Sequence, residues 1–149
     1  VGVNSRLDSI QAAILQVKLQ HLNDYNAARQ KAACFYTQKL SKHDNITLPI
    51  QSTFSSHVYH QYTIQLKNVN RMDLIEKMRE KNIPLMIYYP VPLHLQKAFQ
   101  NMGGKVGDYP ISEQLSHTVL SLPIHTELSD EQLTYIVENF LYFIEKSTL

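Results

Sequence analysis

The sequence predicts an α+β arrangement within the α/β class, in which a long N-terminal helix is followed by a small open sheet covered by helices. Over residues 7–40, apolar side chains recur every three or four positions, which is typical of a helix with a buried face. Residues 59–67 instead alternate apolar and polar types and are rich in β-forming residues. Segments of these two kinds alternate to the end of the chain, which favours helices packed on one face of an open sheet.

The predicted first helix spans residues 7–40 and carries two apolar stripes, so its first half is expected to be covered on two sides. Ile10, Ile14 and Val17 form one stripe, and Leu15, Leu19 and Leu22 form the other. The polar residues next to Leu22 predict a bend or a break there. A continuous helix of this length would measure on the order of 45 Å, at 1.5 Å per residue. Because that exceeds a small compact domain, we expect the helix to bridge to something else.

The remaining helices and strands are predicted from the alternation of apolar and polar residues, from helix-capping residues, and from the prolines and glycines that end helices and strands. The predicted strands are residues 46–49, 59–67, 83–89 and 119–124, and Pro90 and Pro92 hold an extended loop after the third. Asn70 is expected to cap a helix through Met78. A short helix over 93–102 should end at Gly103-Gly104, and another over 110–117 has Asp108 as its candidate cap. Ser129-Asp130-Glu131-Gln132 is a capping box that begins the last helix.

Composition excludes several classes of protein. The 149 residues include 14 Lys and Arg against 13 Asp and Glu, for a net charge of +1. Without runs of like charge, neither nucleic-acid binding nor a membrane-surface patch is supported. No apolar run approaches the ~20 residues that span a bilayer. The single cysteine, Cys34, precludes an internal disulfide and fits a reducing compartment, so we expect a soluble, cytoplasmic protein.

No complete catalytic motif is present. Gly103-Gly104-Lys105 lacks the spacing of a phosphate-binding loop, and no serine stands in a nucleophile elbow. No metal site is expected, because no two histidines have zinc-ligand spacing on a predicted helix. Cys34, among alanines and a phenylalanine, is interpreted as a small core residue.

Polar side chains at the ends of elements are the candidates for function. Asn4 and Arg6 precede the first helix, and their amide and guanidinium donors suit a phosphate or carboxylate. Tyr89 and His94 flank the stiff loop after a predicted strand, and His125 follows another strand. Each also has a structural interpretation: a turn cap, a solvated charge, aromatic packing or a hydrogen-bonded turn histidine.

The motif Gly2-x-Asn4-Ser5-Arg6-Leu7-Asp8-x-x-Gln11-Ala12-Ala13 resembles the DegT/DnrJ/StrS-type sugar aminotransferases, which are pyridoxal-phosphate (PLP) enzymes of the aspartate-aminotransferase fold. The resemblance continues in the family's order through Arg29, Tyr36, His60-Gln61-Tyr62, Arg71, Tyr89-Pro90-x-Pro92-Leu93-His94, Gly107-Asp108-x-Pro110 and Leu122-Pro123-Ile124-His125. The segment Gly-Val-Asn-Ser-Arg-Leu-Asp most resembles the corresponding sequence of enzymes that aminate UDP-linked keto-glucuronate derivatives for lipopolysaccharide sugars.

The resemblance implies that residues 1–40 connect the large and small domains and that residues 41–149 are the small C-terminal domain. Asn4 would bind the PLP phosphate of the neighbouring subunit in a homodimer. Arg6 and His125 would bind the sugar carboxylate or diphosphate, and Tyr89 and His94 would contact substrate or shape the pocket loop. The implied reaction transfers an amino group, with glutamate as donor, to a keto group of a nucleotide-linked sugar.

The family's PLP-binding lysine has no counterpart here, since no lysine of this chain stands in the family's lysine motif. The chain alone is therefore expected to be inactive and to retain no PLP. Two alternatives stay open. A related PLP- or pyridoxamine-phosphate (PMP)-dependent sugar dehydratase would carry histidine in place of the lysine, and a non-catalytic α+β binding module would need neither.

Overall fold

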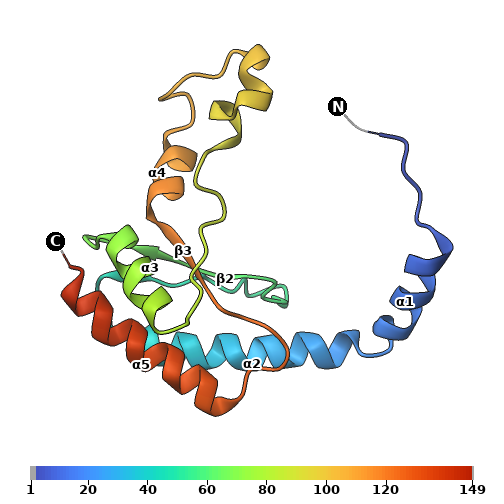
Figure 1. The fold of residues 1–149 in the computed structure, drawn as a ribbon, viewed down its shortest axis with the longest axis horizontal. Helices are drawn as coiled ribbons and strands as arrows, with labels where there is room; N and C mark the ends of the chain where they lie inside the picture. The colour runs from blue at the N-terminus through green and yellow to red at the C-terminus, as the bar shows by residue number, and fades with distance from the viewer. Residues whose placement is uncertain (1–2, 149) are drawn as a thin grey trace.

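The computed structural model describes residues 3–148. Val1, Gly2 and Leu149 lie outside the described residues, and with them the glycine of the Gly-x-Asn motif. Within the described part, helices pack against a small sheet in the centre of the molecule, while α1 (Ser9–Leu19) and the segment that contains α4 (Pro110–Thr118) extend away from it (Figure 1). The predicted α+β class is confirmed.

The predicted first helix is two helices, α1 (Ser9–Leu19) and α2 (Leu22–Leu40). The Asp8 side chain begins α1 by accepting a hydrogen bond from the Gln11 backbone N–H at 2.9 Å. The chain then turns at Gln20 and His21, immediately before the predicted position. As a result α1 leaves the line of α2 rather than continuing it (Figure 1).

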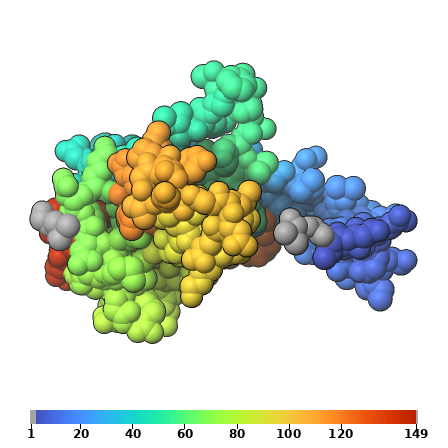
Figure 2. All heavy atoms as spheres, turned by 90° about the horizontal axis from the view of Figure 1, so that it is seen from above, coloured from blue at the N-terminus to red at the C-terminus, as the bar shows by residue number. Residues whose placement is uncertain are grey.

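The expectation that α1 is buried is wrong for this chain. α1 stands clear of the rest of the molecule in both views (Figures 1 and 2), and Ile10 is 76% and Leu19 68% exposed. Helical periodicity reports that a helix has an apolar face, but it does not report which surface covers that face. Exposed apolar patches of this kind mark contacts with another surface.

The sheet has three strands in the order β1-β2-β3, and both pairings are antiparallel. These strands are β1 (Ile46–Thr47), β2 (Tyr62–Leu66) and β3 (Val119–Leu122). Alternate residues of β2 are buried, and Ile64 lies opposite Leu120, so one face of the sheet is apolar. On the other face, the Thr63 and Ser121 hydroxyls are hydrogen bonded at 2.8 Å.

The prediction of a strand over residues 83–89 is wrong. Only Met86 pairs with the sheet, through an isolated antiparallel bridge to Ser121 in which each residue donates to the other, at 3.1 and 2.8 Å. Pro84, two residues before Met86, lacks the N–H that a ladder requires, so the pairing cannot extend in that direction. The apolar run is nevertheless buried, at Ile83 and Leu85.

Helices cover the apolar face of the sheet, as predicted. α2 and α5 (Asp130–Lys146) run along that side, and α3 (Arg71–Glu80) packs against α5 (Figure 1). The core between them includes fully buried Tyr36 and Leu40 from α2, Leu120 from β3 and Phe140 from α5. Cys34 lies on the exposed side of α2, so its interpretation as a core residue is wrong.

Two predicted helix caps are confirmed, and a third is not. The Asn70 side chain accepts from the Asp73 N–H at 3.1 Å, and Ser129 and Gln132 form the reciprocal capping box of α5. Asp108 instead accepts from the Lys105 N–H at 2.8 Å and caps no helix. α4 (Pro110–Thr118) begins with its proline in the first turn and has no side-chain cap.

Residues 86–109 leave the sheet and rise above it before α4 returns the chain to β3 (Figure 1). The helix predicted over 93–102 is two short 3₁₀ helices, η1 (Leu93–Leu95) and η2 (Lys97–Met102). Gly103 ends η2 at φ 79°, a conformation that favours glycine. A Cβ at Gly104 would lie 2.8 Å from the His94 carbonyl oxygen, so the loop closes tightly on His94.

Two phenylalanines test this view of the core. Phe140→Ala removes a fully buried ring and is expected to lower the free energy of unfolding by about 3–5 kcal/mol. Phe54→Ala, at a position 92% exposed, is the control and should change it by less than about 0.5 kcal/mol. Urea denaturation measures both, and equal losses would contradict the assigned core.

Candidate functional site

The N-terminal segment presents the side chains of Asn4 and Arg6 to solvent. Both residues are exposed, and none of the hydrogen bonds or ion pairs found within residues 3–148 engages either side chain. The Asn4 amide and the Arg6 guanidinium are therefore free to bind a group supplied from elsewhere. An amide and a guanidinium at this spacing suit phosphate or carboxylate oxygens.

His125 lies just beyond the end of β3, after Pro123 and Ile124, and it is exposed. Its Nδ1 accepts a hydrogen bond from the Glu127 backbone N–H at 3.1 Å. A ring nitrogen that accepts carries no proton, so in the neutral imidazole the proton lies on Nε2. The ring can thus present an N–H donor to a ligand oxygen.

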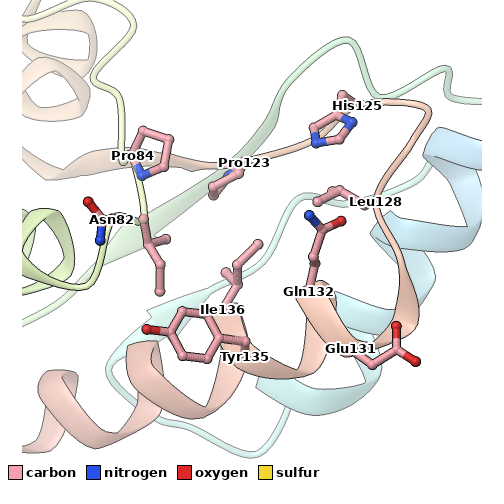
Figure 3. A pocket seen from close by; sticks show the side chains of 10 residues that line it. Asn82, Pro84, Pro123, His125, Leu128, Glu131, Gln132, Tyr135 and Ile136 are labelled. Carbon is pink, nitrogen blue, oxygen red and sulfur yellow. The ribbon is translucent and has the colours of Figure 1, made fainter.

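His125 also lines a cavity of about 490 Å³ between the start of α5 and residues 82–84. Figure 3 shows the His125 ring at one end of this cavity and the Tyr135 ring at the other, with Pro123 between them. The Gln132 amide on its floor is already engaged in the α5 capping box. Apolar side chains alternate with polar ones in the lining, where Asn82, Glu131 and Tyr135 join His125 as groups able to contact a ligand.

Tyr89 lies on the exposed part of the loop, at 70% exposure, with its ring edge-on to Tyr88 at 5.8 Å between centroids. The neighbouring Tyr88, rather than Tyr89, lines a second cavity of about 150 Å³ on the polar face of the sheet. This cavity also includes His60 and Ser121. Of the two adjacent tyrosines, Tyr88 therefore faces this cavity and Tyr89, the candidate from the sequence, does not line it.

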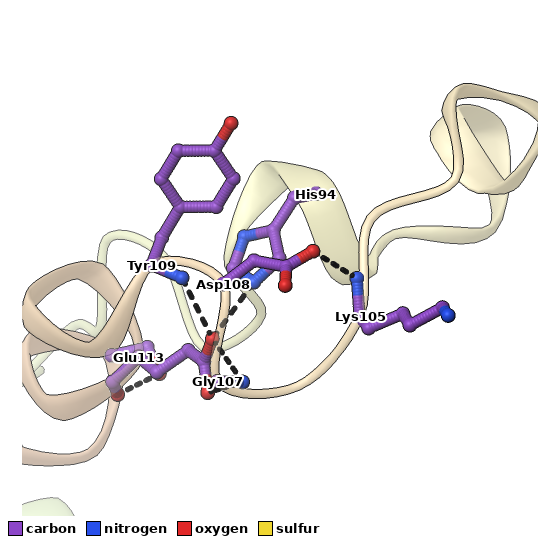
Figure 4. Close-up of polar contacts among 7 residues, drawn as sticks. His94, Lys105, Gly107, Asp108, Tyr109 and Glu113 are labelled. Atoms are coloured by element: carbon purple, nitrogen blue, oxygen red, sulfur yellow. Dashed lines mark hydrogen bonds and ion pairs between the residues drawn. The ribbon is translucent and has the colours of Figure 1, made fainter.

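His94 is only 11% exposed and is paired with Glu113 of α4, with 2.9 Å between Nε2 and a carboxylate oxygen (Figure 4). The same carboxylate accepts backbone hydrogen bonds from Gly107 at 2.9 Å and from Tyr109 at 3.3 Å. The Tyr109 ring lies 4.8 Å from the imidazole. We call His94, Gly107, Tyr109 and Glu113 the loop cluster, because these contacts fold the loop back onto α4.

Electrostatics agree with this arrangement. Burial by itself raises the pKa of Glu113, but the hydrogen bonds from Gly107, His94 and Tyr109 outweigh it, so the pKa is lowered overall. The carboxylate is therefore ionised at neutral pH and accepts several donors at once. Because the His94 Nε2 is already bound to this carboxylate, the contact favours a role for His94 in shaping the loop.

Three further residues organise the site region through backbone carbonyls. The Tyr36 hydroxyl donates to Pro123 O at 2.7 Å, and Arg29 Nη1 donates to Ile124 O at 3.4 Å. Arg71 Nη1 donates to Ser116 O and Val119 O at 2.9 and 2.8 Å, and burial lowers its pKa. Sequence reasoning gave these residues no role. Their partners lie 45 to 95 positions away, so no local spacing signals them.

The structure brings His125, His60 and Tyr88 to the end of the sheet, where His125 lines one cavity, His60 and Tyr88 line another, and both cavities include Pro123. It does not bring Asn4 and Arg6 to them through any hydrogen bond or ion pair within residues 3–148. No group of three or more His, Cys, Asp or Glu side chains able to hold a metal ion occurs in this part of the chain. No helix of residues 3–148 is long and apolar enough to cross a membrane.

Residues 1–141 match the model of the DegT/DnrJ/EryC1/StrS aminotransferase family, and the chain belongs to this family. It is 42% identical over 145 residues to a pleiotropic regulatory protein of Geobacillus stearothermophilus, covering 96% of this chain and 38% of that protein. It is 35% identical over 136 residues to a UDP-2-acetamido-2-deoxy-3-oxo-D-glucuronate aminotransferase of Pseudomonas aeruginosa, covering 91% and 36%. The chain thus spans little more than a third of these relatives.

Solved structures agree with the fold. The chain superimposes with a TM-score of 0.89 and 32% identity on DesV of Streptomyces venezuelae, crystallised with a ketimine intermediate, covering 97% of this chain and 38% of that one. It matches NtdA of Bacillus subtilis with bound cofactor PMP at a TM-score of 0.84 and 27% identity, covering 97% and 34%. The match lies in the C-terminal part of such structures, as the sequence predicted. The identities do not single out the keto-glucuronate enzymes that the opening motif had suggested.

The loop cluster predicts a specific pH dependence. Because the pKa of Glu113 is lower in the folded loop than in an unfolded chain, its stabilising contribution is complete above the ordinary value of about 4.3. That contribution is lost as the pH falls through the lowered value. In NMR titrations the Gly107 and Tyr109 amide signals should shift over this acidic range, and Glu113→Gln should abolish the shifts.

Glu76→Gln is the matched control, because Glu76 also has a lowered pKa, caused mainly by its hydrogen bond from Arg79, and both side chains are exposed on α3. It should leave the Gly107 and Tyr109 titrations unchanged. If those amides titrate alike in the wild type and in Glu113→Gln, the loop cluster does not organise the loop.

Proposed function

We propose that this chain is the C-terminal part of a PLP-dependent, cytoplasmic sugar aminotransferase that acts on a nucleotide-linked sugar, with glutamate as the amino donor. Its membership of the family, among whose members are transaminases of nucleotide-linked sugars, is the observation that carries the proposal. The exposed Asn4 and Arg6 support it, because they present phosphate- and carboxylate-binding groups that make no hydrogen bond or ion pair within residues 3–148.

The donor set of the N-terminal segment fits the cofactor's phosphate. Asn4 is exposed ahead of α1, and its amide N–H groups can donate to phosphate oxygens of a PLP held by the neighbouring subunit of a homodimer. When bound, PLP supplies the electron sink that amino-group transfer requires. The lysine that anchors it is proposed to lie outside residues 1–149.

The proposed substrate-binding side chains differ in their exposure and in the hydrogen bonds that they already make. Arg6 is exposed and would bind the sugar carboxylate or the diphosphate. His125 would donate from Nε2 to a sugar oxygen, since Nδ1 is already an acceptor. Tyr89 would line the entrance to the substrate site. His94, which is held by Glu113, would shape the loop that carries Tyr89.

The exposed α1 argues against a stand-alone binding module. Its apolar side chains lie in water in the described chain, and a helix of this kind is stabilised by packing against another surface. In the proposed enzyme, that surface belongs to the large domain or to the second subunit. The dehydratase alternative differs at the upstream lysine position, and no observation on this chain favours it.

Arg6→Ala in the whole enzyme is expected to raise KM for the nucleotide sugar by about 10- to 100-fold, the range of one lost charge-assisted hydrogen-bond pair. Arg79→Ala is the control, because Arg79 is exposed on α3 and is paired with Glu76. Steady-state kinetics with varied sugar measure both. An unchanged KM in Arg6→Ala would show that Arg6 does not bind the nucleotide sugar.

The shared site predicts complementation between two inactive variants. One is Asn4→Ala, and the other replaces the PLP-anchoring lysine. In mixed dimers, the subunit that retains Asn4 would complete the site of the subunit that retains the lysine, so activity should return in co-expressed protein. If each subunit used its own Asn4, neither site of the mixed dimer would be intact and no activity would appear.

A further inference from the structure

The chain that leaves β3 is held by α2 at the two residues before His125. β3 ends at Leu122, so the Pro123 and Ile124 carbonyls lie beyond the ladder. Tyr36 donates its hydroxyl to Pro123 O at 2.7 Å, and Arg29 Nη1 donates to Ile124 O at 3.4 Å. The shorter bond comes from a side chain with no exposed surface, while the longer one comes from a half-buried arginine.

We infer that Tyr36 is a positioning residue, whose hydrogen bond to the Pro123 carbonyl fixes the direction of the chain after β3 and so the place of the His125 imidazole. The inference rests on the proposed function of His125 as a substrate-binding residue. It adds Tyr36 to the proposed site as a residue that touches no ligand and that acts on His125 through the backbone between Pro123 and His125.

The Tyr36 ring has little freedom to move. It is buried between α2 and the sheet and packs against the Tyr62 ring at 5.2 Å between centroids. A hydroxyl on a fixed ring holds its acceptor at a defined place, and in a water-excluded site no solvent competes for the bond. Burial, with a smaller contribution from Tyr62, raises the pKa of Tyr36, so the hydroxyl stays a donor at physiological pH.

The acceptor side is equally restricted. Pro123 has a fixed φ and no N–H, so this residue cannot join a ladder through its amide. Its carbonyl is the first acceptor past the strand, and His125 follows two residues later. Arg29 makes a weaker contact with Ile124 O, since the same Nη1 also donates to Tyr59 O and His60 O at 3.5 and 3.3 Å. It joins the segment before β2 to the segment after β3.

Tyr36→Phe tests the inference in the whole enzyme, because it deletes one oxygen and keeps the ring. Tyr62→Phe is the matched control. The Tyr62 ring packs against the Tyr36 ring, and its hydroxyl is hydrogen bonded to Thr37 Oγ1 at 2.8 Å rather than to a carbonyl of residues 123–125. Both variants should lower Tm by a similar few degrees. That shared loss represents the structural role alone.

Only Tyr36→Phe should then move His125. Its imidazole Hε1 signal in ¹H–¹³C NMR is expected to shift or broaden in Tyr36→Phe and to match the wild type in Tyr62→Phe. In steady-state kinetics, Tyr36→Phe should lower kcat/KM for the nucleotide sugar by about tenfold, the size expected for a modest misplacement of a binding group. The half-reaction with glutamate should be unchanged.

The two readouts separate the two ways of failing. A His125 signal that responds equally in both variants overturns the positioning role, whatever the kinetics. A signal displaced only in Tyr36→Phe, in a protein whose His125→Ala variant turns over the sugar like the wild type, supports the positioning and overturns the proposed function of His125.

Discussion

The packing of α2 against one face of a three-stranded sheet is the constraint on which the rest of the structure depends. The strands are two to five residues long, and a sheet of this size gains independent stability only when a hydrophobic face is covered. Ala32 and Ala33 have small side chains that let the helix approach closely, and Tyr36 and Leu40 fill the space beyond them. The same helix face that closes the core also carries the hydroxyl that binds Pro123. Core and site are therefore positioned by one packed surface.

The features that the sequence predicted correctly depend on neighbouring residues. Asn70 and Ser129 cap helices through contacts three residues away, and β2 alternates because each side chain faces the opposite side from the next. The errors arise where the outcome depends on distant atoms. Residues 83–89 have the composition of a strand, but pairing needs N–H groups that Pro84 lacks. The apolar face of α1 was predicted correctly, whereas its burial was not, because burial depends on a second surface.

The same distinction applies to the candidate site. The positions of Asn4, Arg6 and His125 at the ends of elements were evident from the sequence, since turns and strand ends have local signals. The partner of His94 was not evident, because Glu113 lies 19 residues further on and is brought near by a loop that closes at Gly104. Tyr36 lies 87 residues from Pro123. Residues that position a binding group act through tertiary contacts, and such contacts leave no spacing in the chain.

The candidate residues also differ in what holds them in place. His125 and His94 are oriented by hydrogen bonds within residues 3–148, to the Glu127 N–H and to the Glu113 carboxylate. Asn4 and Arg6 have no such support there, and they precede the helix whose apolar face is exposed. A binding group reaches useful precision only when its rotamer is fixed by surrounding atoms. A surface that covered α1 would therefore also order Asn4 and Arg6, so that burial of the apolar helix and completion of the proposed anion-binding site would be a single event.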